Sequence, residues 1–203
     1  MSRISLCAIE VLGCCLLLGC GSSPPTHYYM LNVIAPAASG SDSTATNKIA
    51  VRLEPVAIPP ELDRPELLSH SGPYSVHIAD SDRWAAPLED QIRRVMSDDL
   101  ATRLPPGLMA DPNEPATNEP RRLLSISIAQ FSADERCAMS AHASWTLRGP
   151  KGDSVRGTEQ VQLSGSEPCA GAIAAAMSRA LAVLADRLAA VIVAQPESVS
   201  TGP

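Results

Sequence analysis

Hydrophobic and polar residues alternate along several short stretches of the chain, which is the pattern of half-buried β-strands. Residues 48–58 alternate Ile49, Val51 and Leu53 with polar or small side chains, and 74–80 alternate in the same way. The other strands that alternation or strand-forming side chains predict are 27–34, 122–131, 139–147 and 155–163.

Two stretches follow a helical spacing. Between residues 84 and 104, apolar side chains recur every three to five positions and charged side chains occupy the opposite face. That pattern predicts an amphipathic helix, with Ser81 or Asp82 as its N-cap and Pro87 in its first turn. A second helix is predicted over 173–192, where large apolar residues form one stripe within an alanine-rich run.

These elements follow one another in the order β-β-β-α-β-β-β-α. Short connections favour antiparallel neighbours, and each helix has one apolar face that can cover a sheet. The sequence therefore predicts an α+β domain over residues 28–194, with a single mixed, mainly antiparallel sheet and two packed amphipathic helices. Residues 195–203 are expected to form a flexible tail.

The first nineteen residues have the composition of a secretory signal peptide. Residues 4–19 are mostly apolar but contain Glu10, and one Arg precedes them. A helix of that length reaches roughly 24 Å, which is short of the ~30 Å hydrocarbon core of a bilayer. Removal of residues 1–19 is therefore expected, and an uncleaved membrane anchor is the alternative.

The segment Leu17-Leu18-Gly19-Cys20 resembles the lipobox of bacterial lipoproteins, whose cysteine is acylated and becomes the new N-terminus. Lipidation of Cys20 would leave 20–27 as a tether, and the small and proline residues that follow Cys20 suit that role. A rival match ends at Cys14. Cleavage there would leave a shorter apolar core and a greasy mature end, so Cys20 is favoured.

The net charge of −6 is unchanged by that cleavage, because the removed segment carries one Arg and one Glu. An acidic chain without a Lys/Arg cluster is a poor candidate for binding nucleic acid or anionic headgroups by charge. Attachment to the membrane is therefore expected to come from the N-terminal acyl chains.

Two other cysteines would remain in the processed chain, Cys137 and Cys169. In an oxidising periplasm they are candidates for a disulfide. Two unpaired, buried thiols are the alternative.

The sequence lacks the usual signatures of catalysis. It contains no nucleophile elbow, no His-Glu-x-x-His and no phosphate-binding glycine loop, and its four histidines lie in separate segments. Asp80 and Asp82 are explained by helix capping. The expectation is a protein that is not an enzyme and uses no metal or cofactor.

The order of several short motifs resembles the ABC-type transport auxiliary lipoproteins, also called PqiC-like or DUF330 proteins. The family pattern is a lipobox cysteine, a tyrosine-rich strand, a proline-bounded Leu-Asp-Arg segment, an Arg-Trp motif before a helix, and a later tryptophan. The matching residues are Cys20, Tyr28, Tyr29, Leu31, Pro59, Leu62, Asp63, Arg64, Pro65, Arg83, Trp84, Pro87, Leu88, Leu100, Leu104 and Trp145. Pro60 and Glu66 depart from the family pattern.

The resemblance implies a non-catalytic subunit of an intermembrane lipid transport system. Its partners would be an MCE-domain protein and ABC transporter subunits, and it would sit on the periplasmic face of the outer membrane, with a homo-oligomer possible. Gly21, after the acylated cysteine, agrees with outer-membrane sorting. The alternatives are a periplasmic lipid-binding carrier, a lipoprotein that regulates an envelope enzyme and, least favoured, a hydrolase.

The candidate partner-binding residues are Tyr28, Tyr29, Asp63, Arg64 and Arg83. The two tyrosines point to opposite faces of a strand, so at most one is core and the other is a candidate interface anchor. Asp63 and Arg64 form either a local charge pair or an exposed contact in a stiff loop between prolines.

Four further family positions, Pro59, Trp84, Leu88 and Trp145, are expected to be structural. Trp84 lies on the apolar stripe of the first predicted helix and is most simply a core residue.

Overall fold

The computed structural model describes residues 24–36, 49–72, 74–111, 120–165 and 170–195. The predicted signal peptide, Cys14, Cys20 and Gly21 lie outside the described residues. Cys169 and most of the predicted tail also lie outside them, so the proposed disulfide stays a prediction.

The described chain contains two α-helices, one short 3₁₀ helix and seven strands. The helices are η1 (Pro60–Leu62), α2 (Leu88–Arg103) and α3 (Ala170–Ala194). The strands are β1 (His27–Tyr29), β2 (Val51–Leu53), β3 (Glu66–Gly72), β4 (Ser75–Trp84), β5 (Arg122–Ala133), β6 (Met139–Arg148) and β7 (Ser154–Leu163).

The strands form two sheets, so the prediction of a single sheet is wrong, although the α+β class and the two helices are confirmed. One sheet has the order β1-β4-β3 and the other the order β2-β5-β6-β7. Both are mixed, because β1 pairs with β4 and β2 with β5 in parallel, while the other pairs are antiparallel.

The chain leaves the larger sheet after β2 because of its prolines. Pro59 and Pro60 have no N–H to donate to a ladder, and the chain turns through η1 instead of extending the strand. The next two strands then pair with each other as a separate hairpin. One of them, β3, was missed in the predicted order because Leu67, Leu68 and Ser69 are all buried, which removes the alternation that marks a strand.

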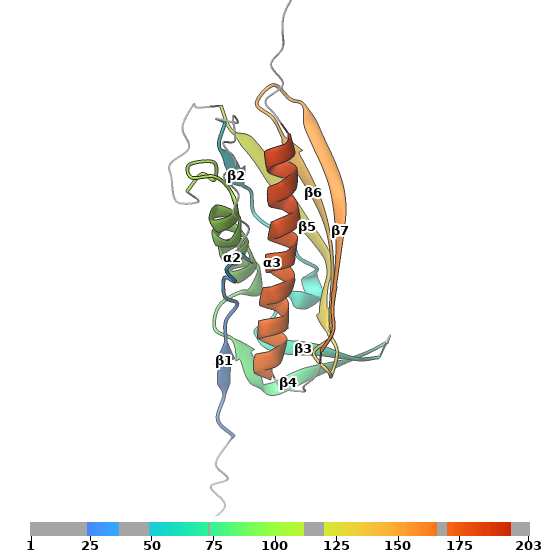
Figure 1. Ribbon diagram of the computed structural model, residues 1–203. Coiled ribbons are helices and arrows are strands. Elements are labelled where there is room, and N and C mark those ends of the chain that lie inside the picture. Colours follow the sequence, from blue (N-terminus) through green and yellow to red (C-terminus); the bar gives the residue numbers. More distant parts are fainter. Residues whose placement is uncertain (1–23, 37–48, 73, 112–119, 166–169, 196–203) are drawn as a thin grey trace, which may run out of the picture.

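The core lies between the larger sheet and the two helices. In Figure 1, α3 runs along the face of β5, β6 and β7, and α2 lies beside it. The predicted stripe on α3 is buried along its whole length, and one side of β6 faces it through Met139, Ala141, Ala143, Trp145 and Leu147.

Helix α2 begins later than predicted. Strand β4 continues through Asp82 and Arg83 to Trp84, so neither Ser81 nor Asp82 caps the helix, and Pro87 occupies the N-cap position. Trp84 is therefore a buried strand residue and not a helix residue.

Gly165, two residues after the end of β7, lies very close to the turn between β5 and β6. Asp134 holds that turn, because its Oδ1 accepts the N–H groups of Arg136 and Ala138 at 2.9 and 2.8 Å. Cys137 is buried there with a φ of 59°. A Cβ atom on Gly165 would lie 1.8 Å from the carbonyl oxygen of Arg136.

Replacement of Gly165 by Ala is expected to lower the free energy of unfolding by about 1–3 kcal/mol, because backbone must move to admit the methyl group. Chemical denaturation monitored by circular dichroism would measure this. The matched control is Gly171→Ala in α3, where the new Cβ would lie 3.7 Å from the ring of Tyr29. That change is expected to be neutral or stabilising, by up to about 1 kcal/mol. Equal effects at the two glycines would contradict the argument.

The molecule is elongated, and its two ends differ. Figure 1 shows β1 and the β3–β4 hairpin at the end where the N-terminal segment emerges, and the C-terminal end of α3 at the opposite end.

Candidate functional site

The N-terminal segment, residues 27–34, lies across the two helices instead of forming one long strand. Only His27–Tyr29 pair with β4. Beyond them, helix side chains take the place of a neighbouring strand. The N–H of Leu31 donates to Gln91 Oε1 at 2.9 Å, and that of Asn32 to Ser178 Oγ at 3.1 Å. The segment is thus fixed by side chains from α2 and α3.

Two arginines and one aspartate on α2 complete this arrangement. Arg94 Nη2 donates to the carbonyl oxygen of Leu31 at 2.9 Å, and Arg103 Nη2 to that of Ile34 at 3.1 Å. Asp99 Oδ1 accepts the N–H of Ile34 at 3.2 Å and Nη1 of Arg103 at 3.0 Å. The buried ion pair between Asp99 and Arg103 therefore ends the fixed part of the segment.

Burial of Asp99 removes its carboxylate from water. Its side chain is 0% exposed and that of Arg103 is 4% exposed. Burial raises the pKa of the Asp99 carboxyl above its usual 3.8, and the hydrogen bond from Ile34 and the charge of Arg103 oppose that rise. The other oxygen, Oδ2, accepts no hydrogen bond from the described residues. The ionised form of Asp99 therefore depends on Arg103.

The small sheet places three residues from distant motifs side by side. Tyr28 on β1 is opposite Arg83 on β4, and Arg83 is opposite Glu66 on β3. Directly opposite residues share one face of a sheet, so these three form a row, which we call the cross-strand row. Tyr28 is 66% exposed at one end of the row.

Glu66 organises the charges beside Tyr28. Its Oε2 accepts Nε of Arg64 at 3.2 Å, and its Oε1 lies 3.9 Å from Nη2 of Arg83. A hydrogen bond from its own backbone N–H, followed by the hydrogen bond from Arg64, lowers the pKa of Glu66 below 4.5. Glu66 is therefore anionic at neutral pH, with two arginines around it.

The opposite face of β1 turns toward the core. Tyr29 packs against the core cluster, and its hydroxyl donates to Asp82 Oδ1 at 3.3 Å. His27 Nδ1 lies 3.2 Å from the same oxygen. The carboxylate that had been predicted to cap a helix instead binds β1.

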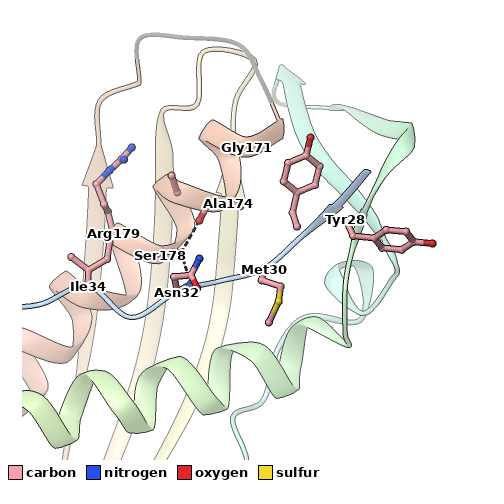
Figure 2. A pocket seen from close by; sticks show the side chains of 10 residues that line it. Tyr28, Met30, Asn32, Ile34, Gly171, Ala174, Ser178 and Arg179 are labelled. Atoms are coloured by element: carbon pink, nitrogen blue, oxygen red, sulfur yellow. Dashed lines mark hydrogen bonds between the residues drawn. The ribbon is translucent and has the colours of Figure 1, made fainter. Parts of the chain in front are cut away.

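An open groove of about 540 Å³ lies between the N-terminal segment and the first turns of α3. Figure 2 shows Asn32 joined to Ser178 on one side and Tyr28 pointing away from Gly171 and Ala174. The lining residues are Tyr28, Tyr29, Met30, Asn32, Ile34, Gly171, Ala174, Ala175, Ser178 and Arg179. Most of this surface is apolar, with Arg179 as its cation.

The residues predicted from sequence divide into two groups. Tyr28 and Arg83 belong to the cross-strand row and Arg64 pairs with its Glu66, whereas Asp63 is exposed in the turn after η1. Arg64 pairs with Glu66 and not with Asp63. The structural positions lie elsewhere. Pro59 precedes η1 and is half-buried, and Leu88 and Trp145 are in the core.

The sequence analysis missed the polar side chains that fix the N-terminal segment. Gln91 and Asp99 lie three and eleven positions after Leu88, on the buried face of α2. Polar residues within an apolar helical stripe are a usable signal, because burial requires that they have partners. Their partners could not be identified from spacing, since they are backbone groups some sixty residues away.

The described residues contain no group of three or more His, Cys, Asp or Glu side chains arranged to hold a metal ion. Within the same residues, no helix combines the length and the apolar character needed to cross a bilayer. The cross-strand row and the groove present an aromatic ring, apolar surface and charged side chains.

Comparison with known proteins identifies relatives of the whole domain. A family model described as the ABC-type transport auxiliary lipoprotein component matches residues 29–189. The intermembrane transport lipoprotein PqiC of Escherichia coli (strain K12) is 27% identical over 134 residues, which cover 64% of this chain and 68% of PqiC. PqiC of Shigella flexneri matches to the same extent.

Two solved structures share the fold. The crystal structure of an uncharacterised protein aligns with a TM-score of 0.69 at 19% identity, and the alignment covers 83% of this chain and 99% of that protein. A DUF330 protein from Xanthomonas campestris aligns with a TM-score of 0.63 at 16% identity, covering 82% of this chain and 94% of that protein. The three proteins thus share one overall fold.

Proposed function

Because this chain belongs to the family of ABC-type transport auxiliary lipoprotein components, as its motifs had indicated, we propose that it is the docking subunit of an intermembrane lipid transporter. In this proposal it binds an MCE-domain protein that works with ABC transporter subunits. It acts by binding and catalyses no reaction. The family match over residues 29–189 carries the proposal.

The exposed side of the N-terminal segment supports docking. Tyr28 and Met30 are exposed next to the groove, and the cross-strand row adds Arg83 and Glu66 beside Tyr28. Aromatic residues and arginines are the side chains that most often dominate binding energy at protein interfaces. The backbone of this segment is held by two helices, so little conformational freedom is lost on binding.

A carrier that shields an acyl chain within the domain is less well supported. Such a carrier would need an enclosed apolar cavity. The groove at the N-terminal segment is open, and Tyr28 and Met30 on its wall are exposed to solvent. An open apolar surface suits a partner that covers it.

We place the protein on the periplasmic face of the outer membrane, held by acyl chains on Cys20. The Leu-Leu-Gly-Cys segment and the following Gly21 support this location. Two or more acyl chains hold a protein on a membrane essentially permanently.

The proposal is tested by photo-crosslinking in intact cells of the native organism. A photoreactive amino acid at Met30 is expected to capture the MCE-domain protein, identified by mass spectrometry. The control places the same group at Val155, which is also exposed and apolar but lies on β7, outside the groove and the row. Val155 is expected to give no such product.

Two results would contradict the proposal. Repeated capture of a cell-wall enzyme at Met30 would favour the alternative of an enzyme regulator. Capture of the MCE-domain protein equally at Met30 and Val155 would show that the groove does not select the partner.

A further inference from the structure

One apolar stripe leaves the core and runs out along the β3–β4 hairpin. Leu68 is opposite Ile78 and His70 is opposite Val76, so these side chains share one face. Leu68 is 8% exposed and Ile78, opposite it on β4, is 38% exposed, while Val76, nearer the tip, is 48% exposed. Tyr74, two residues further on, is fully exposed. We call Tyr74, Val76 and Ile78 the hairpin stripe.

The hairpin tip is poor in charged side chains, and His77 is its one basic residue. Between His70 and Asp80 the sequence has no Asp, Glu, Lys or Arg, although charged residues follow directly in Asp80, Asp82 and Arg83. A tip poor in charge and with an exposed tyrosine has the composition of segments at a membrane interface, where the tyrosine ring enters the lipid and its hydroxyl stays hydrated.

The path of the chain places this hairpin close to the membrane anchor. Six residues lie between Cys20 and His27, so the seven steps from one Cα atom to the next span at most about 25 Å. His27 pairs with Asp82 of β4, the same strand that forms one side of the hairpin. Figure 1 shows the hairpin at the end of the molecule where the N-terminal segment emerges. The proposed anchor is thus joined to the strand that forms the hairpin by a tether of limited reach.

We propose that the tip of the β3–β4 hairpin contacts the lipid surface to which the chain is anchored, through the hairpin stripe. The inference rests on the lipidation of Cys20 in the proposed function. The contact would set the orientation of the domain on the membrane, because an anchor at one point leaves rotation free and a second contact removes it. The cross-strand row, with the charges of Glu66 and Arg83 and with Arg64 paired to Glu66, then remains for a protein partner.

The test uses the full-length, lipidated protein in vesicles of phosphatidylethanolamine and phosphatidylglycerol. Tyr74→Trp places a fluorophore at the tip, and phospholipids with brominated acyl chains quench indoles that enter the bilayer. The two native tryptophans, Trp84 and Trp145, are buried and provide a constant background. The emission of the added Trp is expected to fall by about half or more with brominated lipids, as for an interfacial aromatic side chain.

The matched control is Val155→Trp, because Val155 is exposed to a similar degree as Ile78 but lies on β7 of the larger sheet. Its emission is expected to be the same with brominated and ordinary lipids. Addition of Val76→Glu to Tyr74→Trp is expected to restore most of the lost emission. Unchanged emission of Trp84 and Trp145 in Val76→Glu alone would show that the variant is folded.

The outcomes separate this inference from the proposed function. If the protein floats with the vesicles but Tyr74→Trp is not quenched, the hairpin contact is wrong and the lipid anchor stands. If Tyr74→Trp is quenched only when a second copy or an MCE-domain partner is present, the tip is a protein contact and the inference is overturned. If the protein does not float and carries no acyl chain at Cys20, both proposals fail.

Discussion

Replacement of Arg103 by Met is expected to lower the free energy of unfolding by about 3–5 kcal/mol at pH 7, the cost of breaking a buried ion pair by removing one partner. Met keeps much of the apolar stem of Arg103 and removes its charge. Asp99, which is 0% exposed, would then remain in the core without its cation. Urea denaturation at fixed pH measures the change.

The loss is expected to shrink as the pH falls. The pKa of the Asp99 carboxyl is already raised by burial, and removal of Arg103 would raise it further. A carboxyl with a raised pKa contributes stability that is fully present below its unfolded pKa, 3.8, and lost as the pH rises through its folded pKa. Denaturation of Arg103→Met at mildly acidic pH should therefore show a smaller difference from the wild type.

The matched control is Arg94→Met on the same helix. Arg94 also donates to a carbonyl oxygen of the N-terminal segment and lies 3.9 Å from an aspartate four residues later, but both of these charged side chains are about half exposed. Its loss is expected to cost about 1 kcal/mol or less from the ion pair. Equal losses for Arg94→Met and Arg103→Met, or a loss for Arg103→Met that is independent of pH, would contradict the explanation.

Replacement of Cys20 by Ser is expected to move the protein from the membrane fraction to the soluble fraction almost completely. Serine offers no thiol for acylation, and each buried methylene group of an acyl chain contributes about 0.8 kcal/mol to membrane binding. Removal of two such chains leaves no comparable source of affinity, since the net charge is −6 and the chain lacks a basic cluster. Fractionation of cell envelopes and intact-mass measurement would detect both changes.

Cys14→Ser is the matched control, because Cys14 ends the rival lipobox. It is expected to leave the lipid modification and the membrane fraction unchanged. If the Cys20→Ser variant keeps its lipid and the Cys14→Ser variant loses it, the lipidated residue is Cys14 and not Cys20. If the wild type and both variants carry no lipid, the proposal of an acyl anchor is wrong.

The sequence predicted which face of a single helix or strand is buried in the core. The stripe from Ile173 to Ile192 places α3 on the larger sheet, and alternation in β5 and β6 predicts which side chains face it. The alternation of side chains along a strand likewise predicted that Tyr28 and Tyr29 lie on opposite faces. In each case the signal is periodic and the partner is simply the core.

The sequence did not predict contacts between residues that lie far apart along the chain. The N-terminal segment looks like one long strand, but after Tyr29 its backbone groups bind Gln91, Ser178 and Asp99, which no spacing rule connects to it. Asp82 looked like a helix cap because it precedes a helix, whereas it binds a tyrosine hydroxyl of β1. The cross-strand row depends in turn on the register of β1 and β3 with β4, which two prolines and η1 help to set.

The way in which the N-terminal segment is held has a mechanical consequence. Tension on a chain attached at Cys20 would act along this segment, whereas the hydrogen bonds of a strand pair lie across the strand direction. The pairing of β1 with β4 and the side-chain bonds to Leu31, Asn32 and Ile34 would therefore share the load in shear and would not open one after another. This arrangement would resist a pulling force applied at the N-terminal end of the segment more strongly than bonds that open one at a time.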